Sequence, residues 1–197
     1  MKFTHCLASV ALVSVLGACG GVQNQVAAAQ SPVDYVNPYM GNISHLLVPT
    51  FPTIHLPNSM LRVYPERADY TTDMLNGLPL IVTSHRGSSA FNLSPYQGDN
   101  LRPVVAYSYD NEKLKPYYYE VVLDDEEINV KYAPSRQSAL YQIDYGKRDK
   151  PVYMMINSRN GAIKAGDGFV SGYQQLENNT RVFLYIESDV APIETGI

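Results

Sequence analysis

The amino-acid sequence predicts an all-β protein, an antiparallel β-sandwich that follows a leader segment. Three observations predict this fold class. Tyrosine, which favours strands, occurs 16 times, whereas tryptophan is absent. The second half of the chain alternates apolar and polar residues in short runs separated by glycine and asparagine turns, a pattern typical of sandwiches. No stretch carries the apolar spacing of a long amphipathic helix.

The overall composition limits the classes of protein and partner. The chain has 197 residues, a formal net charge of -4, 17% charged residues and 45% hydrophobic residues. This balance excludes a disordered tail, a collagen-like repeat and a heptad repeat. Because there is no basic excess to neutralise phosphates, we expect no nucleic-acid partner.

The first residues indicate a targeting segment. Lys2 supplies a positive start, and Leu7–Ala18 forms an apolar run that is too short to span a ~30 Å hydrocarbon core. Signal peptides carry such a run. It ends in Leu16-Gly17-Ala18-Cys19, which resembles a bacterial lipobox. We therefore expect a lipoprotein signal peptide over residues 1–18 and a lipid on Cys19, which anchors the protein to the bacterial cell envelope on its periplasmic or outer surface.

The leader is followed by a tether and a domain. Residues 19–31 are rich in Gly, Gln and Ala and predict a flexible tether, and residues 32–197 form the folded domain. Ordinary secretion, with cleavage near Ala27–Ala29, is the alternative for the leader. Cys6 and Cys19 are the only cysteines. Once Cys19 is lipidated, no thiol remains for a disulfide, a zinc site or nucleophilic catalysis, so the domain depends on its core.

Prolines interrupt the first half of the domain. Five of them fall within residues 37–65, a spacing through which no helix runs. Short strands are predicted over Met60–Tyr64, Leu78–Ser84 and Val104–Tyr109. Elsewhere in this half, Met74-Leu75 is interpreted as a single helical turn and Asp110–Glu112 as a loop tip.

Strands dominate the second half. In Tyr117–Leu123, residues 117, 119, 121 and 123 form one apolar face, and Ile128–Tyr132 alternates after an acidic turn, so these two runs predict a hairpin. Val152–Ile156 is apolar throughout and predicts a strand buried on both faces. The remaining predicted strands are Ala139–Tyr145, Phe169–Tyr173 and Arg181–Glu187.

Two strings near the start of the domain resemble a known family. Val36-Asn37-Pro38-Tyr39-Met40-Gly41 is followed by Phe51-Pro52, Pro57, Met60 and Pro65. In order and spacing they resemble the opening of glycoside hydrolase family 92, the calcium-dependent exo-acting α-mannosidases. That family starts with V-N-P-hydrophobic-hydrophobic-G and continues with [FY]-P-G-A-x-x-P-[FW]-G-M and a strand ending in S-P.

A later stretch strengthens the resemblance. Pro116–Asp125, Ile128 and Ala133–Arg136 look like the family's hairpin, P-G-Y-Y-x-V-x-L-D-D-x-x-I-x-A-E-L-[ST]-x-T-x-R. Val170–Tyr173 resembles a later [IV]-x-G strand of the family. The resemblance covers about residues 34–190, which is nearly all of the chain after the expected leader.

The sequence also departs from the family pattern. Thr53-Ile54 stands where members carry Gly-Ala, and Asn58-Ser59 stands where they carry Phe-Gly. The family's G-F-S-H-T-H-[LF]-S-G segment would fall near Gly77, but its paired histidines are not in register here. These departures indicate a divergent branch and leave the preferred sugar and linkage open.

The resemblance implies a fold and a function. It implies the family's N-terminal β-sandwich, of the galactose-mutarotase-like supersandwich type, which in members precedes an (α/α)6 barrel with the catalytic acid and base and most calcium ligands. Nothing here matches that barrel, so we expect a truncated or split protein that meets its catalytic domain in cis or in trans. Calcium is the family's cofactor, and none is assignable in this chain. The implied substrate is a mannose-containing glycan, and among the linkages left open above the α-1,2 type is the one we expect.

Loop residues are the candidate substrate contacts. By the same resemblance, loops of the N-terminal domain lean over the pocket of the barrel, and His45, His85 and Arg86 are expected to bind the sugar. The alternative is that Arg86 pairs with a surface carboxylate and the histidines pack at the domain interface. No catalytic residue and no metal ligand is assigned. The acidic run 124–127 is interpreted as a solvated hairpin turn rather than a calcium site.

Two other functions stay open at this point. A free-standing carbohydrate-binding surface lipoprotein would bind mannosides without a partner and would have no catalytic role. A purely structural envelope lipoprotein would bind no ligand at all.

Overall fold

The computed structural model describes residues 30–42, 50–67, 72–83, 89–100, 106–123, 127–146 and 149–192. The expected signal peptide and Cys19 lie outside these ranges. Ser31–Ile197 forms one compact unit, and the description below concerns that unit. Its described part contains strands and two short 3-10 turns but no α-helix. No helix within these ranges is long and apolar enough to cross a membrane.

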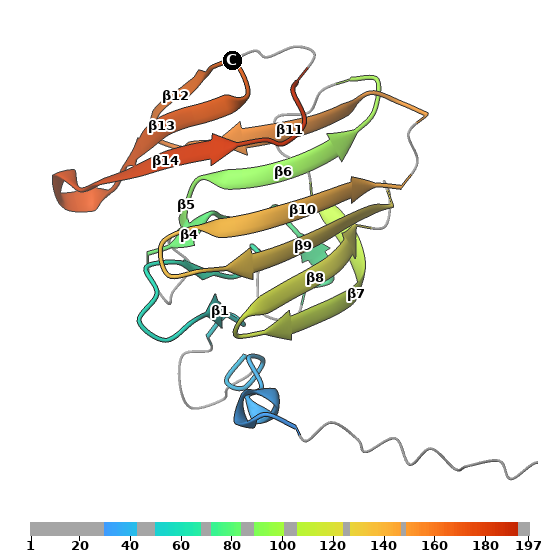
Figure 1. Ribbon diagram of the computed structural model, residues 1–197, viewed down its shortest axis with the longest axis vertical. Helices are drawn as coiled ribbons and strands as arrows, with labels where there is room; N and C mark the ends of the chain where they lie inside the picture. Colours follow the sequence, from blue (N-terminus) through green and yellow to red (C-terminus); the bar gives the residue numbers. More distant parts are fainter. Residues whose placement is uncertain are drawn as a thin grey trace, which may run out of the picture. The chain divides into compact units, whose positions relative to one another are not determined.

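The largest sheet has five antiparallel strands (Figure 1). Its order is β10-β9-β8-β7-β3, so four consecutive strands lie side by side, and β3 pairs with the free edge of β7. The strands are β3 (Met74–Leu75), β7 (Tyr107–Lys115), β8 (Tyr118–Leu123), β9 (Ile128–Pro134) and β10 (Ala139–Tyr145).

The alternating pattern of β8 and β9 builds much of the core. Tyr119 and Leu123 on β8 lie opposite Tyr132 and Ile128 on β9, and all four side chains are buried. Because successive side chains of a strand point to opposite faces, one face of this hairpin is apolar throughout. Burial of the apolar side chains of Leu123 and Ile128 contributes about 1.5–3 kcal/mol each to folding. The predicted hairpin is confirmed, with β8 beginning at Tyr118.

In the described ranges, four smaller antiparallel sheets complete the unit. β6 pairs with β11, and β13 lies between β12 and β14 in a three-stranded sheet (Figure 1). β1 pairs with β2, and β4 pairs with β5. The elements are η1 (Pro32–Tyr35), β1 (Ile54–His55), β2 (Arg62–Val63), β4 (Ile81–Val82), β5 (Ser89–Ala90), β6 (Asn92–Gln97), β11 (Val152–Asn157), β12 (Gly161–Ala165), β13 (Phe169–Gln175), η2 (Glu177–Asn179) and β14 (Arg181–Glu187).

The sheets share one hydrophobic core. Ile54 of β1, Val63 of β2 and Tyr96 of β6 belong to the same buried cluster as Leu75 of β3 and Tyr107 of β7. Apolar faces of different antiparallel sheets are therefore packed against each other, as in a β-sandwich. The predicted all-β, antiparallel sandwich is confirmed.

Three local predictions are wrong in whole or in part. Met74-Leu75 is not a helical turn, because it pairs as strand β3 with β7 and buries Leu75 completely. Val152–Ile156 does lie in a strand, β11, but this strand is not buried on both faces. Val152 and Met154 are exposed, and β11 pairs only with β6 among the described strands.

The acidic segment Asp110–Glu112 is also not the expected loop tip. It lies inside β7, where the register against β8 shifts between Asp110 and Lys113. Asn111 has a φ of 54°, in the left-handed region. The register shift is a β-bulge, which bends the strand and redirects its side chains. It places Glu112 in the interior, with consequences for the site described next.

Candidate functional site

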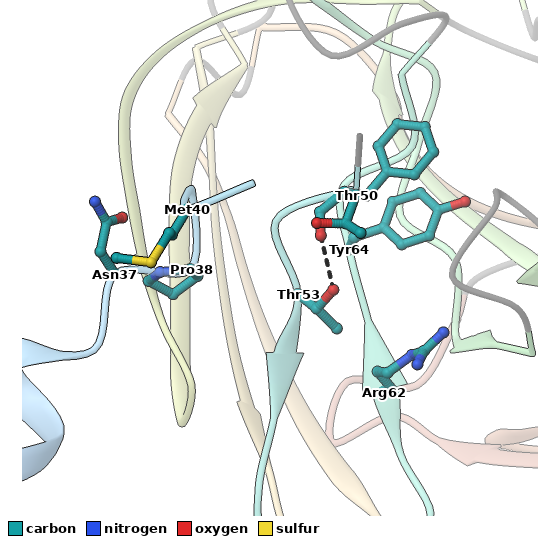
Figure 2. A pocket seen from close by; sticks show the side chains of 8 residues that line it. Asn37, Pro38, Met40, Thr50, Thr53, Arg62 and Tyr64 are labelled. Atoms are coloured by element: carbon teal, nitrogen blue, oxygen red, sulfur yellow. Dashed lines mark hydrogen bonds between the residues drawn. The ribbon is translucent and has the colours of Figure 1, made fainter. Parts of the chain in front are cut away.

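An open pocket lies where the two proline-containing strings of the first half meet (Figure 2). Its volume is about 320 Å³, at the lower end of the range for small-ligand sites. The turn with Asn37, Pro38 and Met40 forms one wall, and Figure 2 shows Thr50, Thr53, Tyr64 and Arg62 across from it. The lining residues are Asn37, Pro38, Met40, Thr50, Phe51, Thr53, Arg62 and Tyr64.

Local hydrogen bonds shape the turn wall. Asn37 Oδ1 accepts a hydrogen bond from the backbone N–H of Tyr39 (3.0 Å), and the N–H of Met40 donates to the Asn37 carbonyl (3.1 Å). Asn followed by Pro favours such a turn. Gly41 follows at a φ of +91°, a conformation that favours glycine. The Gly41 carbonyl accepts the N–H of Thr50 (3.0 Å), which ties the turn to the opposite wall.

The opposite wall combines aromatic and polar groups. The rings of Phe51 and Tyr64 stack with centroids 4.3 Å apart and planes 7° apart. The Thr53 hydroxyl donates to the Phe51 carbonyl (2.9 Å), as the dashed line in Figure 2 shows. Arg62 lies on β2, and its Nε is buried with no hydrogen-bond acceptor among the described residues. This wall therefore presents the partly exposed ring of Phe51, a threonine hydroxyl and the guanidinium of Arg62, while the ring of Tyr64 is buried behind Phe51.

A buried ion pair lies close to the turn wall. Arg67 Nη2 pairs with Glu112 Oε1, and their side chains are only 5% and 10% exposed. The Tyr39 hydroxyl donates to Glu112 Oε2 (2.7 Å), and the Tyr119 hydroxyl donates to Glu112 Oε1 (3.1 Å). The Arg67 guanidinium also lies over the ring of Tyr109, 5.0 Å from its centroid. One carboxylate thus collects three donors from three separate segments.

The two tyrosine hydroxyls of this cluster stay protonated and act as hydrogen-bond donors. Desolvation by burial raises the pKa of Tyr39 above its usual value of 10, and the hydrogen bond to Glu112 raises it further. Burial likewise raises the pKa of Tyr119 well above its usual value, with the negative charge of Glu112 as the next cause. Both hydroxyls therefore keep their protons at neutral pH and can donate to the carboxylate.

The family model of the Glycosyl hydrolase family 92 N-terminal domain matches residues 35–197. The chain belongs to glycosyl hydrolase family 92. Among solved structures, it is similar to the family GH92 alpha-mannosidase BT3965 from Bacteroides thetaiotaomicron, with 21% sequence identity and a TM-score of 0.58. The structure of that enzyme in complex with mannoimidazole matches with the same identity and TM-score. The curated proteins contain no match.

The family 92 match fits the described geometry. The likeness to the two alpha-mannosidase structures covers 72% of this chain and only 23% and 22% of theirs, and it shows a shared fold. Every residue that lines the pocket falls within the span matched by the family model. The family resemblance of the sequence is therefore confirmed, and its first two strings meet at the pocket.

The predicted substrate contacts lie outside the described residues. His45, His85 and Arg86 fall in the gaps at 43–49 and 84–88, as do residues 124–126 of the acidic run in the gap after β8. His55, which is described, is exposed, with its Nε2 3.2 Å from the Ser59 carbonyl oxygen. In the described ranges, no group of three or more His, Cys, Asp or Glu side chains could hold a metal ion.

Sequence reasoning missed the residues that the structure brings together here. Arg62 gave no signal, since it stands in a short predicted strand without a motif of its own. Glu112 was interpreted as part of a loop tip, because the polar run Asp110–Glu112 is typical of loops. Tyr39 lies in the V-N-P string, so the family resemblance was the one signal that pointed to this turn.

Proposed function

We propose that this family 92 domain is the carbohydrate-binding and scaffolding part of an α-mannosidase that acts on mannose-containing glycans with α-1,2 linkages. The catalytic acid and base come, in this proposal, from a separate (α/α)6 catalytic domain in cis or in trans. The observation that carries the proposal is that the two strings typical of the family line one open pocket.

The chemistry of the pocket suits a sugar. The partly exposed ring of Phe51, backed by the buried ring of Tyr64, offers apolar surface for the C–H groups of a pyranose. The polar side chains of Asn37, Thr53 and Arg62 can bond its hydroxyls. Polar groups that converge beside apolar surface are usual in small-ligand sites. We propose that His45, His85 and Arg86 add further contacts to the same glycan.

Calcium is implied by the family but does not fit the described residues. Calcium needs six to eight oxygen ligands, usually with several carboxylates. The described residues bring together no suitable group of side chains. The proposal therefore places calcium in the catalytic domain and assigns no step to it here.

An aromatic face on β14 supports the presence of a partner domain. Phe183 and Tyr185 are 74% and 62% exposed and alternate along β14, so they share one face. Phe169 stacks on Tyr185 at 5.5 Å, and Tyr173 lies 6.4 Å from Phe183. Exposed apolar surface of this kind typically marks an interaction site. We propose that the catalytic domain packs against this aromatic face of β14.

The proposal includes a membrane anchor. We propose that Cys19 carries a lipid and holds the domain at the bacterial cell envelope. Replacement of Cys19 by serine should then release the protein from the membrane fraction, and the intact mass of the wild-type protein should include the lipid.

Calorimetric titration of the full chain tests the binding role. We expect saturable binding of α-1,2-mannobiose and weaker binding of maltose, a glucose disaccharide that serves as the control. Absence of binding to mannobiose and to longer mannans would contradict the proposal. A mannobiose affinity that does not change when the catalytic domain is supplied would favour a free-standing carbohydrate-binding lipoprotein.

A further inference from the structure

Both walls of the pocket are connected to one buried carboxylate that does not line it. On the turn wall, Tyr39 stands between the lining residues Pro38 and Met40, and its hydroxyl donates to Glu112 Oε2 at 2.7 Å. On the other wall, the chain continues from Tyr64 to Arg67, which pairs with Glu112 Oε1. The two carboxylate oxygens of Glu112 therefore connect the two walls of the pocket.

The carboxylate itself is held firmly. Glu112 Oε1 also accepts the hydroxyl of Tyr119, a fully buried residue in the centre of the main sheet. Hydrogen bonds to a charged group are about twice as strong as neutral ones, and a low local dielectric strengthens them further. The bulge in β7 turns Glu112 toward this cluster and away from the regular β7–β8 ladder.

We propose that Glu112 is a positioning residue for the sugar pocket. Its carboxylate sets the separation of the turn wall from the Arg67 side of the pocket, and the affinity for sugar depends on it without any contact to the sugar. The choice of sugar as the ligand rests on the proposed function, whereas the positioning role does not.

Tyr39→Phe is the sharpest perturbation, because it removes one hydroxyl and leaves the ring. Tyr118→Phe is the matched control, since the Tyr118 hydroxyl donates to the carboxylate of Glu120 at 3.1 Å, away from the pocket. The amide of Thr50 reports on the walls because it donates to Gly41 in the turn. We expect Tyr39→Phe to speed hydrogen exchange at Thr50 about tenfold and to weaken α-1,2-mannobiose binding, with little change in Tyr118→Phe.

Glu112→Gln extends the test, because the amide nitrogen must face either Tyr39 or Arg67. We expect it to raise Thr50 exchange and lower affinity at least as much as Tyr39→Phe does, with Glu120→Gln as its control. Wild-type exchange at Thr50 in both folded variants, or equal changes in the controls, would overturn the positioning role. If Thr50 exchange rises but the wild-type chain binds no mannobiose, the positioning role stands and the proposed function fails.

Discussion

Replacing Arg67 by methionine should destabilise the domain strongly. The methionine keeps most of the apolar stem, but Glu112, with 10% of its side chain exposed, loses its cation. Breaking a buried ion pair in this way costs about 3–5 kcal/mol. The hydroxyls of Tyr39 and Tyr119 remain at 2.7 and 3.1 Å from the carboxylate, which favours the lower end of that range. Loss of the contact with the Tyr109 ring adds ~0.5–1 kcal/mol.

Urea unfolding followed by circular dichroism measures this loss. With a slope of roughly 2 kcal/mol per molar urea, a loss of about 3 kcal/mol lowers the midpoint by about 1.5 M. The double variant Arg67→Met/Glu112→Gln removes both charges and should be more stable than Arg67→Met alone. A single-variant loss below ~1 kcal/mol, or a double-variant loss equal to the sum of the single losses, would refute the reasoning.

Three other predictions concern separate parts of the domain. Tyr141→Phe should raise stability by about 1 kcal/mol in urea unfolding, because the buried Tyr141 hydroxyl has no hydrogen-bond partner among the described residues; a loss of stability would contradict this. The hydrogen bond from Lys113 lowers the pKa of Glu120 below its usual 4.5. The folded state therefore gains stability from Glu120 above that pH and loses it as the pH falls through the lowered pKa, so Glu120→Gln should unfold with a weaker dependence on pH between about 5 and 3. Arg62→Met should weaken mannobiose binding about fivefold or more by calorimetry, whereas Arg136→Met, at an exposed arginine outside the pocket lining, should leave it unchanged.

The hairpin of β8 and β9 could be predicted from the sequence because its information is local. Alternation in Tyr117–Leu123 and Ile128–Tyr132 marks the buried face of each strand, and the acidic turn marks where the chain reverses. The burial of one face then determines the register. No contact distant in sequence was needed to identify the pair.

The first half resisted prediction because its strands are too short to carry a pattern. Met74-Leu75 is a two-residue strand that exists only because β7, more than 30 residues later, offers an edge for pairing. Two residues cannot distinguish alternation from a helical turn. Likewise, Val152–Ile156 is apolar in sequence, but only the arrangement of the sheets decides that Val152 stays exposed.

The candidate site was predictable only where a family string passed through it. Val36–Gly41 and Phe51–Met60 drew attention to the segments that form the two walls. The carboxylate that joins them could not be found in the same way, because Arg67 and Glu112 are 45 residues apart and Asp110–Glu112 reads as a solvated loop. The β-bulge in β7 buries the Glu112 side chain instead of leaving it in a solvated loop. No local sequence pattern predicts such a bulge.

The buried pair has more value for geometry than for net stability. The free-energy cost of desolvating two charges offsets much of the attraction between them. A protein with an uncharged replacement of similar volume is therefore often as stable. Arg67→Met/Glu112→Gln should therefore regain stability, yet the introduced amide has an oxygen at only one of the two positions that accept the hydroxyls of Tyr39 and Tyr119. We expect this variant to fold with near wild-type stability and still bind mannobiose weakly. Recovery of both properties together would show that packing alone places the walls and that the charges are dispensable.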